Sequence, residues 1–332
     1  MSPAPSWPGF EAYNAALLSG GILDPELAGA RPALNGWGQP SAISGGFAFT
    51  YRMNRPGAVP KALRLFHSGA AERRAAMAAA YRAVDAARRE GPLARFLVGA
   101  RWVESCVRAG GTAAPGVVMD WVEAPTLGPW LETAYADPAA LERLRGELAT
   151  LQDAPLAFEG VLEGGEGCVH GDVQAGNLAV ADGVALVLLD YDAFRSEDDA
   201  DRSGEAGHVH FRHPDAAAGG NADRFPLLAL DLGLAALAAD PGLFEFCEGE
   251  NVVWRADDYA DPESSPAFAR AAGVPALSRA AALFADVCKG SAEAVPSLGE
   301  FRDAAGLSAP GPVPGARSKG RGKKGNSAAS AV

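Results

Sequence analysis

Hydrophobic and polar positions alternate in the first third of the chain in a pattern that predicts short antiparallel strands. Residues 42–53 have the pattern of a strand, a glycine-rich turn at Gly45 and Gly46, and a second strand. Residues 61–66 predict another strand after an Asn-Arg-Pro-Gly turn. The connecting loops are too short for crossovers, so these strands are expected to pair antiparallel. Two more strands are expected further along, at 98–107 and 117–122.

The other apolar runs have the spacing and length of helices. Residues 70–90 are rich in alanine and arginine and contain neither glycine nor proline, which predicts one long helix. A short helix is expected at 8–18, and further helices at 127–134, 138–152 and 223–239. The pattern stays helical to about residue 305.

One compact β unit interrupts the helical part. Two short apolar runs, 178–180 and 185–189, flank Asp182-Gly183, a dipeptide typical of a tight hairpin. A polar turn at 170–177 leads directly into the first run. The polar side chains of this turn are therefore expected to lie on a rigid support.

Charge limits the partners that the chain can have. Residues 1–308 carry 24 basic and 41 acidic residues, a net charge of −17, because five of the 29 basic residues lie in the tail. Such an acidic body is a poor general nucleic-acid binder, which confines a nucleic-acid role to the basic segment 317–324. The tail, 309–332, is rich in Pro, Gly, Ser and Ala and is predicted to be disordered and solvated.

Cysteine spacing and hydropathy indicate a cytoplasmic protein. The four cysteines are scattered and form no C-x-x-C pair, which favours buried, reduced thiols. The first residues lack the basic and apolar segments of a secretory signal. No run of about 18 apolar residues occurs, so no membrane span is expected.

The polar turn before the hairpin carries the residues with the clearest chemistry. Asp172 can accept a proton, and Asn177 and Asp190 offer the hard oxygen atoms that Mg²⁺ prefers. Asp190 directly follows the second apolar run, so all three side chains emerge from one small β unit. A base beside two oxygen ligands for Mg²⁺ is what metal-assisted phosphoryl transfer requires.

This motif resembles the protein-kinase-like superfamily. The spacing His170-x-Asp172-x4-Asn177 is similar to the catalytic-loop pattern H-x-D-x4-N, and Asp190 opens an Asp-Tyr-Asp triplet where that family has D-F-G. Gly171 follows the form of aminoglycoside- and choline-type phosphotransferases. The full HGD…N and DYD wording also resembles a group of bacterial kinase-fold proteins.

The resemblance implies a two-lobed, kinase-like α+β fold. A small β-rich N-lobe is expected at 36–122 and a larger helical C-lobe at 123–308, after an N-terminal extension at 1–35 and before the tail at 309–332. The implied cofactors are ATP and Mg²⁺, with the nucleotide between the lobes. The implied activity is phosphoryl transfer to a protein Ser/Thr or to a small-molecule hydroxyl.

The resemblance also assigns roles in the C-lobe. Asp172 is expected to be the catalytic base, with Asn177 and Asp190 as metal ligands. His170 and Asp223 are expected to be structural: His170 holds the loop, while Asp223 caps the helix that follows it and braces the catalytic loop.

In the N-lobe, the resemblance assigns the nucleotide contacts. Gly45 and Gly46 stand at the phosphate-covering turn. Because side chains alternate along a strand, Ala62 and Arg64 share a face, which leaves room for adenine beside Ala62 and puts Arg64 where the family has its phosphate-binding lysine. Lys61 is an alternative cation on the other face.

The expected hinge is the strand at 117–122. Met119 is the implied gatekeeper, and the Asp120 carbonyl and the Val122 amide are expected to bind the adenine edge. The preceding helix departs from the family, because residues 76–84 contain no acid that could pair with the phosphate-binding cation.

Four alternatives stay open. The departures at Arg64 and in the helix favour a pseudokinase, a nucleotide-binding scaffold or regulator with little turnover. His208, His210 and His213 could bind zinc or stabilise a loop. Asp192 could add a metal ligand or be a solvated loop charge. The acidic run 197–201 has the pattern of a solvated loop, and it could also attract a cationic substrate such as an amine or aminoglycoside.

Overall fold

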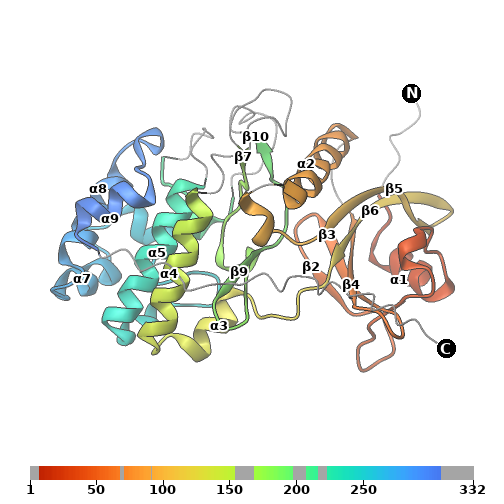
Figure 1. The fold of residues 1–332 in the computed structure, drawn as a ribbon, viewed down its shortest axis with the longest axis horizontal. Coiled ribbons are helices and arrows are strands. Elements are labelled where there is room, and N and C mark those ends of the chain that lie inside the picture. The colour runs from red at the N-terminus through yellow and green to blue at the C-terminus, as the bar shows by residue number, and fades with distance from the viewer. Residues whose placement is uncertain are drawn as a thin grey trace, which may run out of the picture.

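The computed structural model describes residues 7–67, 71–90, 92–153, 168–196, 207–215 and 223–307. It is an α+β protein in which a β-sheet with two flanking helices lies at one end and a group of helices at the other (Figure 1). A small β unit lies between the two parts (Figure 1). The acidic run 197–201 and the tail 309–332 lie outside the described residues.

The large sheet is antiparallel throughout, as the short loops predict. Its strand order is β1-β3-β4-β6-β5, and β2 pairs with the free side of β3. The strands are β1 (Arg31–Pro32), β2 (Ala42–Ser44), β3 (Ala48–Asn54), β4 (Lys61–Phe66), β5 (Ala100–Ala109) and β6 (Thr112–Asp120). The tight hairpin between β5 and β6 turns at Gly110 and Gly111, both with positive φ, so β6 begins and ends earlier than the apolar pattern indicates.

The first 35 residues, expected as an extension, are built into the sheet. β1 pairs with β3, and helix α1 (Phe10–Ser19) packs its buried Tyr13 and Leu17 into a cluster on one sheet face. The Tyr13 hydroxyl donates to the Phe66 carbonyl at 2.7 Å. The short helix alone could not bury its apolar residues, so it packs against the sheet.

The opposite face of the sheet is covered by helix α2 (Ala71–Glu90) (Figure 1). Strand β4 separates the two clusters: Leu63 and Leu65 face α1, while Ala62 and Phe66 belong to the main core with α2. Arg64 lies between Ala62 and Phe66 in this alternation. Its side chain therefore projects on the α2 side of the sheet.

The helical part is organised around one buried helix, α5 (Arg224–Ala239). Every residue from Phe225 to Leu237 is buried, which explains why this stretch is apolar apart from Asp231. The other helices are α3 (Leu127–Ala134), α4 (Pro138–Asp153), α6 (Ala256–Ala260), α7 (Pro266–Gly273), α8 (Ser278–Lys289) and α9 (Leu298–Ala305). Short 3₁₀ helices occupy Pro25–Leu27, Pro92–Arg95, Ala175–Asn177, Val209–Phe211, Pro241–Phe246 and Ala292–Ala294.

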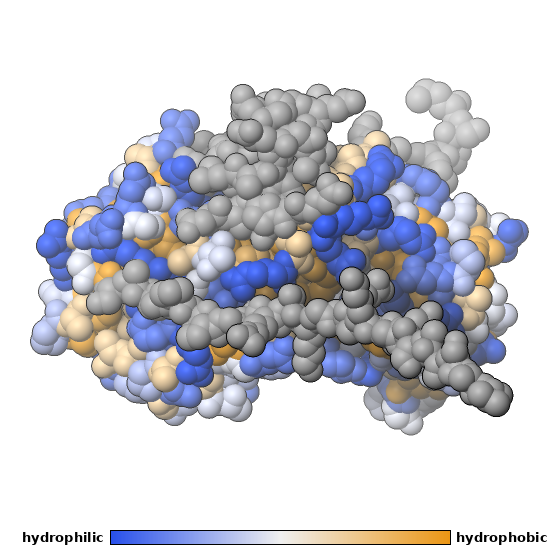
Figure 2. All heavy atoms as spheres, viewed as in Figure 1, coloured by the Kyte–Doolittle hydropathy of each residue, from blue (hydrophilic) through white to orange (hydrophobic). Residues whose placement is uncertain are grey.

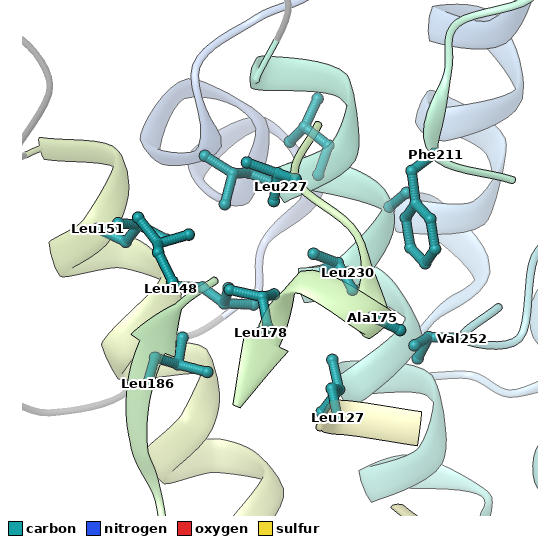
Figure 3. Close-up of a cluster of buried hydrophobic side chains, with 14 of the residues drawn as sticks. Leu127, Leu148, Leu151, Ala175, Leu178, Leu186, Phe211, Leu227, Leu230 and Val252 are labelled. Carbon is teal, nitrogen blue, oxygen red and sulfur yellow. The ribbon is translucent and has the colours of Figure 1, made fainter. Parts of the chain in front are cut away.

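The small β unit packs onto these helices. Strand β8 (Leu178–Ala181) pairs with β9 (Ala185–Leu188), and β7 (Cys168–Val169) pairs with β10 (Arg195–Ser196). The predicted hairpin turn is confirmed, with positive φ at both Asp182 and Gly183. Leucines of α4, α5, β8 and β9 interdigitate beneath it (Figure 3). The hairpin thus rests on a rigid apolar support.

The described surface has a mixed polar and apolar character, and the described cysteines are free thiols. Hydrophilic and hydrophobic residues alternate in small patches over the described part of the face in Figure 2. Cys106 and Cys288 are buried and Cys247 is half-buried, all as free thiols. Among the described residues, no helix has the length and apolar character needed to cross a membrane.

Candidate active site

The polar loop that follows β7 is tied to the start of α5. The backbone N–H groups of His170 and Gly171 both donate to the Asp223 carboxylate, at 2.6 and 2.9 Å. Asp223 was also expected to cap α5, but its side chain makes no capping hydrogen bond. Both of its oxygens are used by the loop, so its geometry is that of a brace.

His170 fastens the loop to the other strand of the small hairpin. Its Nε2 lies 3.0 Å from the Leu189 carbonyl, and its Nδ1 accepts the Asp172 N–H at 3.4 Å. The ring is buried and packs edge-on against Tyr191. With both nitrogens directed at backbone groups, His170 has a structural position.

The Asp172 carboxylate is oriented by three donors. Its Oδ2 accepts from the side-chain amides of Asn177 and Gln174, both at 2.8 Å, and its Oδ1 accepts the His208 N–H at 2.9 Å. Gln174 and the His208 backbone were not singled out from the sequence. Gln174 lies within the motif and could have been considered there, whereas the contact of His208 spans 36 residues and has no local signal.

Asn177 joins the two halves of the motif. Its side-chain N–H₂ donates to the Asp172 carboxylate, and its backbone carbonyl accepts the Leu189 N–H at 2.8 Å, next to Asp190. Its side-chain oxygen has no hydrogen-bond partner in the described part of the chain.

Asp190 directly follows this contact and has a left-handed backbone conformation, with φ of 58°. Its Oδ2 accepts from Arg64 Nη2 at 2.8 Å, although the two residues are 126 positions apart. Burial by itself would lower the pKa of Arg64, but the neighbouring carboxylates Asp190 and Asp192 outweigh it and raise that pKa. Arg64 is therefore a fully charged group at the edge of the motif.

Asp192 lies deeper than Asp190. Its side chain is 5% exposed, against 30% for Asp190, and its Oδ2 accepts from Arg64 Nη2 at 2.5 Å. Its Oδ1 accepts from the Tyr81 hydroxyl at 2.7 Å. Burial, followed by the charge of Asp190, raises the pKa of Asp192. The solvated-charge interpretation of Asp192 is therefore wrong, and its oxygens bind protein donors where a metal role was the alternative.

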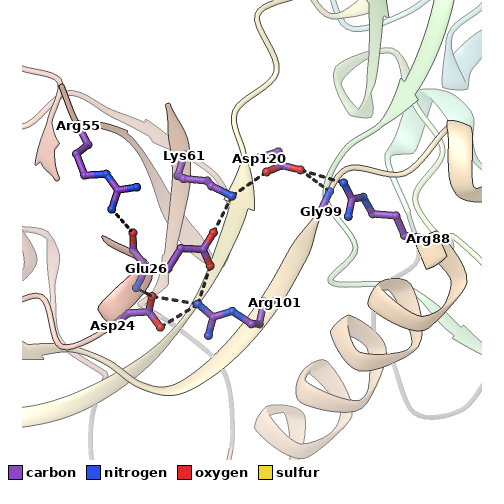
Figure 4. Close-up of polar contacts among 8 residues, drawn as sticks. All are labelled: Asp24, Glu26, Arg55, Lys61, Arg88, Gly99, Arg101 and Asp120. Atoms are coloured by element: carbon purple, nitrogen blue, oxygen red, sulfur yellow. Dashed lines mark hydrogen bonds and ion pairs between the residues drawn. The ribbon is translucent and has the colours of Figure 1, made fainter. Parts of the chain in front are cut away.

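Lys61 lies away from these groups, in a separate ionic network at the other face of β4 (Figure 4). Its Nζ lies 2.7 Å from Glu26 and 2.9 Å from Asp120. The Asp120 carboxylate also accepts from the Gly99 N–H at 3.1 Å and from Arg88 at 3.4 Å. Of the two candidate cations, the structure brings only Arg64 to Asp190.

The expected hinge strand, β6, ends at Asp120, a member of this ionic network. Met119 pairs with Ala62 across β6 and β4, and both side chains are buried. Strand β6 ends at Asp120, whose N–H donates to the Gly99 carbonyl at 2.8 Å. The Val122 amide has no hydrogen-bond partner among the described residues. A backbone donor thus remains open next to the buried Ala62–Met119 pair.

The glycine-rich turn joins β2 to β3. Its Gly45 N–H donates to the Ala48 carbonyl at 2.9 Å, which closes a tight hairpin. His67 Nε2 lies 3.2 Å from the Gly45 carbonyl, and its ring packs on Phe49. Gly46 occupies the tip, where an added Cβ would meet no atom within 4 Å.

The three histidines of the 208–213 segment stabilise a loop. His213 Nε2 lies 2.9 Å from the Val287 carbonyl and its Nδ1 accepts the Asp215 N–H at 3.0 Å. His210 Nδ1 accepts the Ala256 N–H at 3.2 Å. Among the described residues, no group of three or more His, Cys, Asp or Glu side chains is arranged to hold a metal ion. These contacts favour the loop interpretation over a zinc site.

A small cavity lies behind the loop. Its volume is about 20 Å³, far below the size of a nucleotide site. It is lined by Leu93, Leu151, His170, Val173, Leu188, Phe194, Asp223 and Leu227. The cavity lies between the loop residues His170 and Asp223 and the apolar side chains beneath them.

The chain matches no protein-family model and no curated protein sequence. The chemistry of the site therefore has to be inferred from its own residues.

Proposed function

We propose that the chain is an ATP- and Mg²⁺-dependent phosphotransferase whose sheet and helical parts form the two lobes of a protein-kinase-like fold. The observation that carries the proposal is the linked set Asp172–Asn177–Asp190–Arg64. Asn177 bonds the base at 2.8 Å, its carbonyl bonds the residue before Asp190, and Asp190 pairs with Arg64 at 2.8 Å. A base, two oxygen ligands and a cation from the sheet thus form one continuous polar site.

Asp172 would accept the proton of the attacking hydroxyl. The amides of Asn177 and Gln174 hold one oxygen of its carboxylate, so its direction is set before an acceptor arrives. Such preorientation is a main source of rate enhancement in phosphoryl transfer, because little covalent chemistry falls to the protein.

The oxygen atoms of Asn177 and Asp190 fit Mg²⁺. This ion takes one or two protein oxygens and completes its shell with phosphates and water, so a cage of several carboxylates is not needed. Mg²⁺ at this position would neutralise charge on the nucleotide phosphates.

Arg64 fits a role in phosphate binding. Only its Nη2 is bonded, and its Nε is buried without a partner in the described structure. The guanidinium keeps its full positive charge beside the two carboxylates, so a phosphate group would be a natural ligand for it. The open Val122 amide beside Ala62 and Met119 supports adenine binding at the hinge.

The test compares binding with turnover. We expect ATP to raise the melting temperature more with Mg²⁺ than without it, and γ-phosphate consumption to fall at least about 100-fold in Asp172→Asn, because general-base catalysis contributes that much. Asp182→Asn is the matched control, since it makes the same chemical change in an exposed hairpin turn. Turnover that is equal in the wild type and Asp172→Asn would refute the proposal.

A nucleotide-binding pseudokinase is the second candidate. It is favoured by one observation: the Arg64 guanidinium and the Asp190 carboxylate already form an ion pair with each other. Binding of ATP without Asp172-dependent phosphate consumption, across protein and small-molecule hydroxyl acceptors, would select this function over the first.

A further inference from the structure

We infer that Asp192 and Tyr81 are positioning residues that hold Arg64 for the nucleotide phosphates and connect it to helix α2. The inference rests on the proposed function, because it assigns a task at that same site. It concerns the point where the sequence departs from the kinase pattern, the absence of any acid at residues 76–84.

Arg64 is shared between two carboxylates of unequal character. Its Nη2 lies 2.5 Å from Asp192 and 2.8 Å from Asp190, but the Asp192 side chain is 5% exposed and the Asp190 side chain is 30% exposed. The inner carboxylate cannot exchange its partner for water without leaving a buried charge unpaired, which is strongly unfavourable. The outer one can. Arg64 therefore has a permanent partner in Asp192 and an exchangeable one in Asp190.

The two partners of Arg64 allow Asp190 to have two roles that would otherwise exclude each other, pairing with Arg64 and binding a metal ion. Asp190 cannot bind a cation fully while it neutralises Arg64. If Asp190 were the only partner, Mg²⁺ binding would leave the guanidinium without its counterion. Because Asp192 would stay bonded, Arg64 would keep its place and its charge if Asp190 turned to a metal ion. The guanidinium would then remain available to a phosphate group.

Tyr81 extends the arrangement to α2. Its hydroxyl donates to Asp192 Oδ1 at 2.7 Å, while Arg64 bonds the other oxygen. The Tyr81 ring is fully buried and packs against Trp102 and Tyr191, so the hydroxyl has little freedom. Burial, followed by the charge of Asp192, holds the pKa of Tyr81 well above its usual value and keeps it a hydrogen-bond donor. The buried Asp192 carboxylate, held by the neutral Tyr81 hydroxyl, thus takes the place of an acidic side chain on α2 as the partner of Arg64.

The arrangement makes a prediction that a purely structural role would not. Asp192→Asn should raise the KM for MgATP about 10- to 100-fold, since a charged hydrogen bond is lost, with a smaller effect on kcat. Tyr81→Phe should raise it about 3- to 10-fold. In the Asp192→Asn background, Tyr81→Phe should add nothing, because Tyr81 acts through Asp192. Asp192→Glu should restore part of the affinity.

The experiment measures KM and kcat for MgATP, together with nucleotide affinity by calorimetry, for wild type, both single variants, the double variant and Asp192→Glu. Tyr135→Phe is the matched control, because Tyr135 stacks on Phe244 away from the site. Full additivity of the two substitutions, or wild-type affinity in Asp192→Asn, would overturn the inference while Asp172-dependent turnover leaves the proposed function standing. Failure of the wild type to bind MgATP would overturn both. If Asp192→Asn does not fold, Tyr81→Phe decides alone, and an unchanged KM then refutes the role.

Discussion

Asp231 lies in the middle of α5 and joins three helices by its charge. It is completely buried and accepts from Arg145 Nε of α4 at 2.9 Å and from Arg302 Nε of α9 at 3.0 Å. Arg302 also donates to the Arg145 carbonyl at 2.9 Å. We expect Asp231→Ala to destabilise the protein strongly, because it leaves two guanidinium groups in the interior without their shared counterion.

The size of the expected loss in unfolding free energy follows from the burial of the two arginine side chains. The side chains of Arg145 and Arg302 are 4% and 5% exposed, so neither can recover its hydration without a rearrangement. Removing one partner of a buried ion pair typically costs about 3–5 kcal/mol of unfolding free energy. Arg145 keeps a second carboxylate in Glu142, but Arg302 has none among the described residues. The expected loss is therefore about 4–5 kcal/mol, near the upper end of that range.

Urea unfolding followed by tryptophan fluorescence measures this loss. The matched control is Asp303→Ala, which removes an exposed carboxylate from α9 and should change the free energy of unfolding by less than about 0.5 kcal/mol. An Asp231→Ala loss as small as the control's would refute the reasoning. Replacing Arg145, Asp231 and Arg302 together by Met, Leu and Met should recover most of the stability, because the cost arises from stranded charges.

Three further predictions concern close contacts and charge. Gly233→Ala should lower stability by about 1–3 kcal/mol in urea unfolding, since its Cβ would lie 2.7 Å from the backbone carbonyl oxygen of Val252 inside the buried helix α5; an unchanged midpoint would contradict this. Gly207→Ala should lower the kcat of the proposed phosphotransferase, because a φ of 69° strains any side chain at this position beside the loop of Asp172; a wild-type kcat would exclude that effect. The hydrogen bond from Lys61 lowers the pKa of Glu26 below 4.5, so its stabilisation exists above that pH and is lost as the pH falls below it. Glu26→Gln should flatten the acid side of the stability profile, and an unaltered profile would refute the role.

Local sequence signals predicted most of the secondary structure. The helix expected at 223–239 is found as α5 at Arg224–Ala239, and the Asp182-Gly183 turn has the expected backbone. These elements depend on interactions between residues close in the chain, so periodicity and turn chemistry suffice to find them. β1 was missed because it is only two residues long, and its strand character comes from its pairing with β3.

Part of the site is equally local. Asp172 and Asn177 are five residues apart in one loop, and their 2.8 Å contact agrees with the spacing of the motif. The brace from Asp223 agrees in part: the loop contacts are present, but the helix cap is not, because both oxygens are directed at the loop and the Asp223 backbone lacks the extended conformation typical of an N-cap residue.

The sequence by itself thus predicted the strand–turn–hairpin motif. It also predicted the alternation that puts Ala62 and Arg64 on one face of β4. It could not reveal which charges meet. Arg64 lies 126 residues from Asp190 and 128 from Asp192, and Tyr81 lies 111 from Asp192. The packing of the sheet and α2 against the hairpin brings these groups together, and burial turns Asp192 from an apparent loop charge into the partner of Arg64. Contacts of this range have no periodicity in the sequence, because they follow from how the elements pack and not from how each one forms.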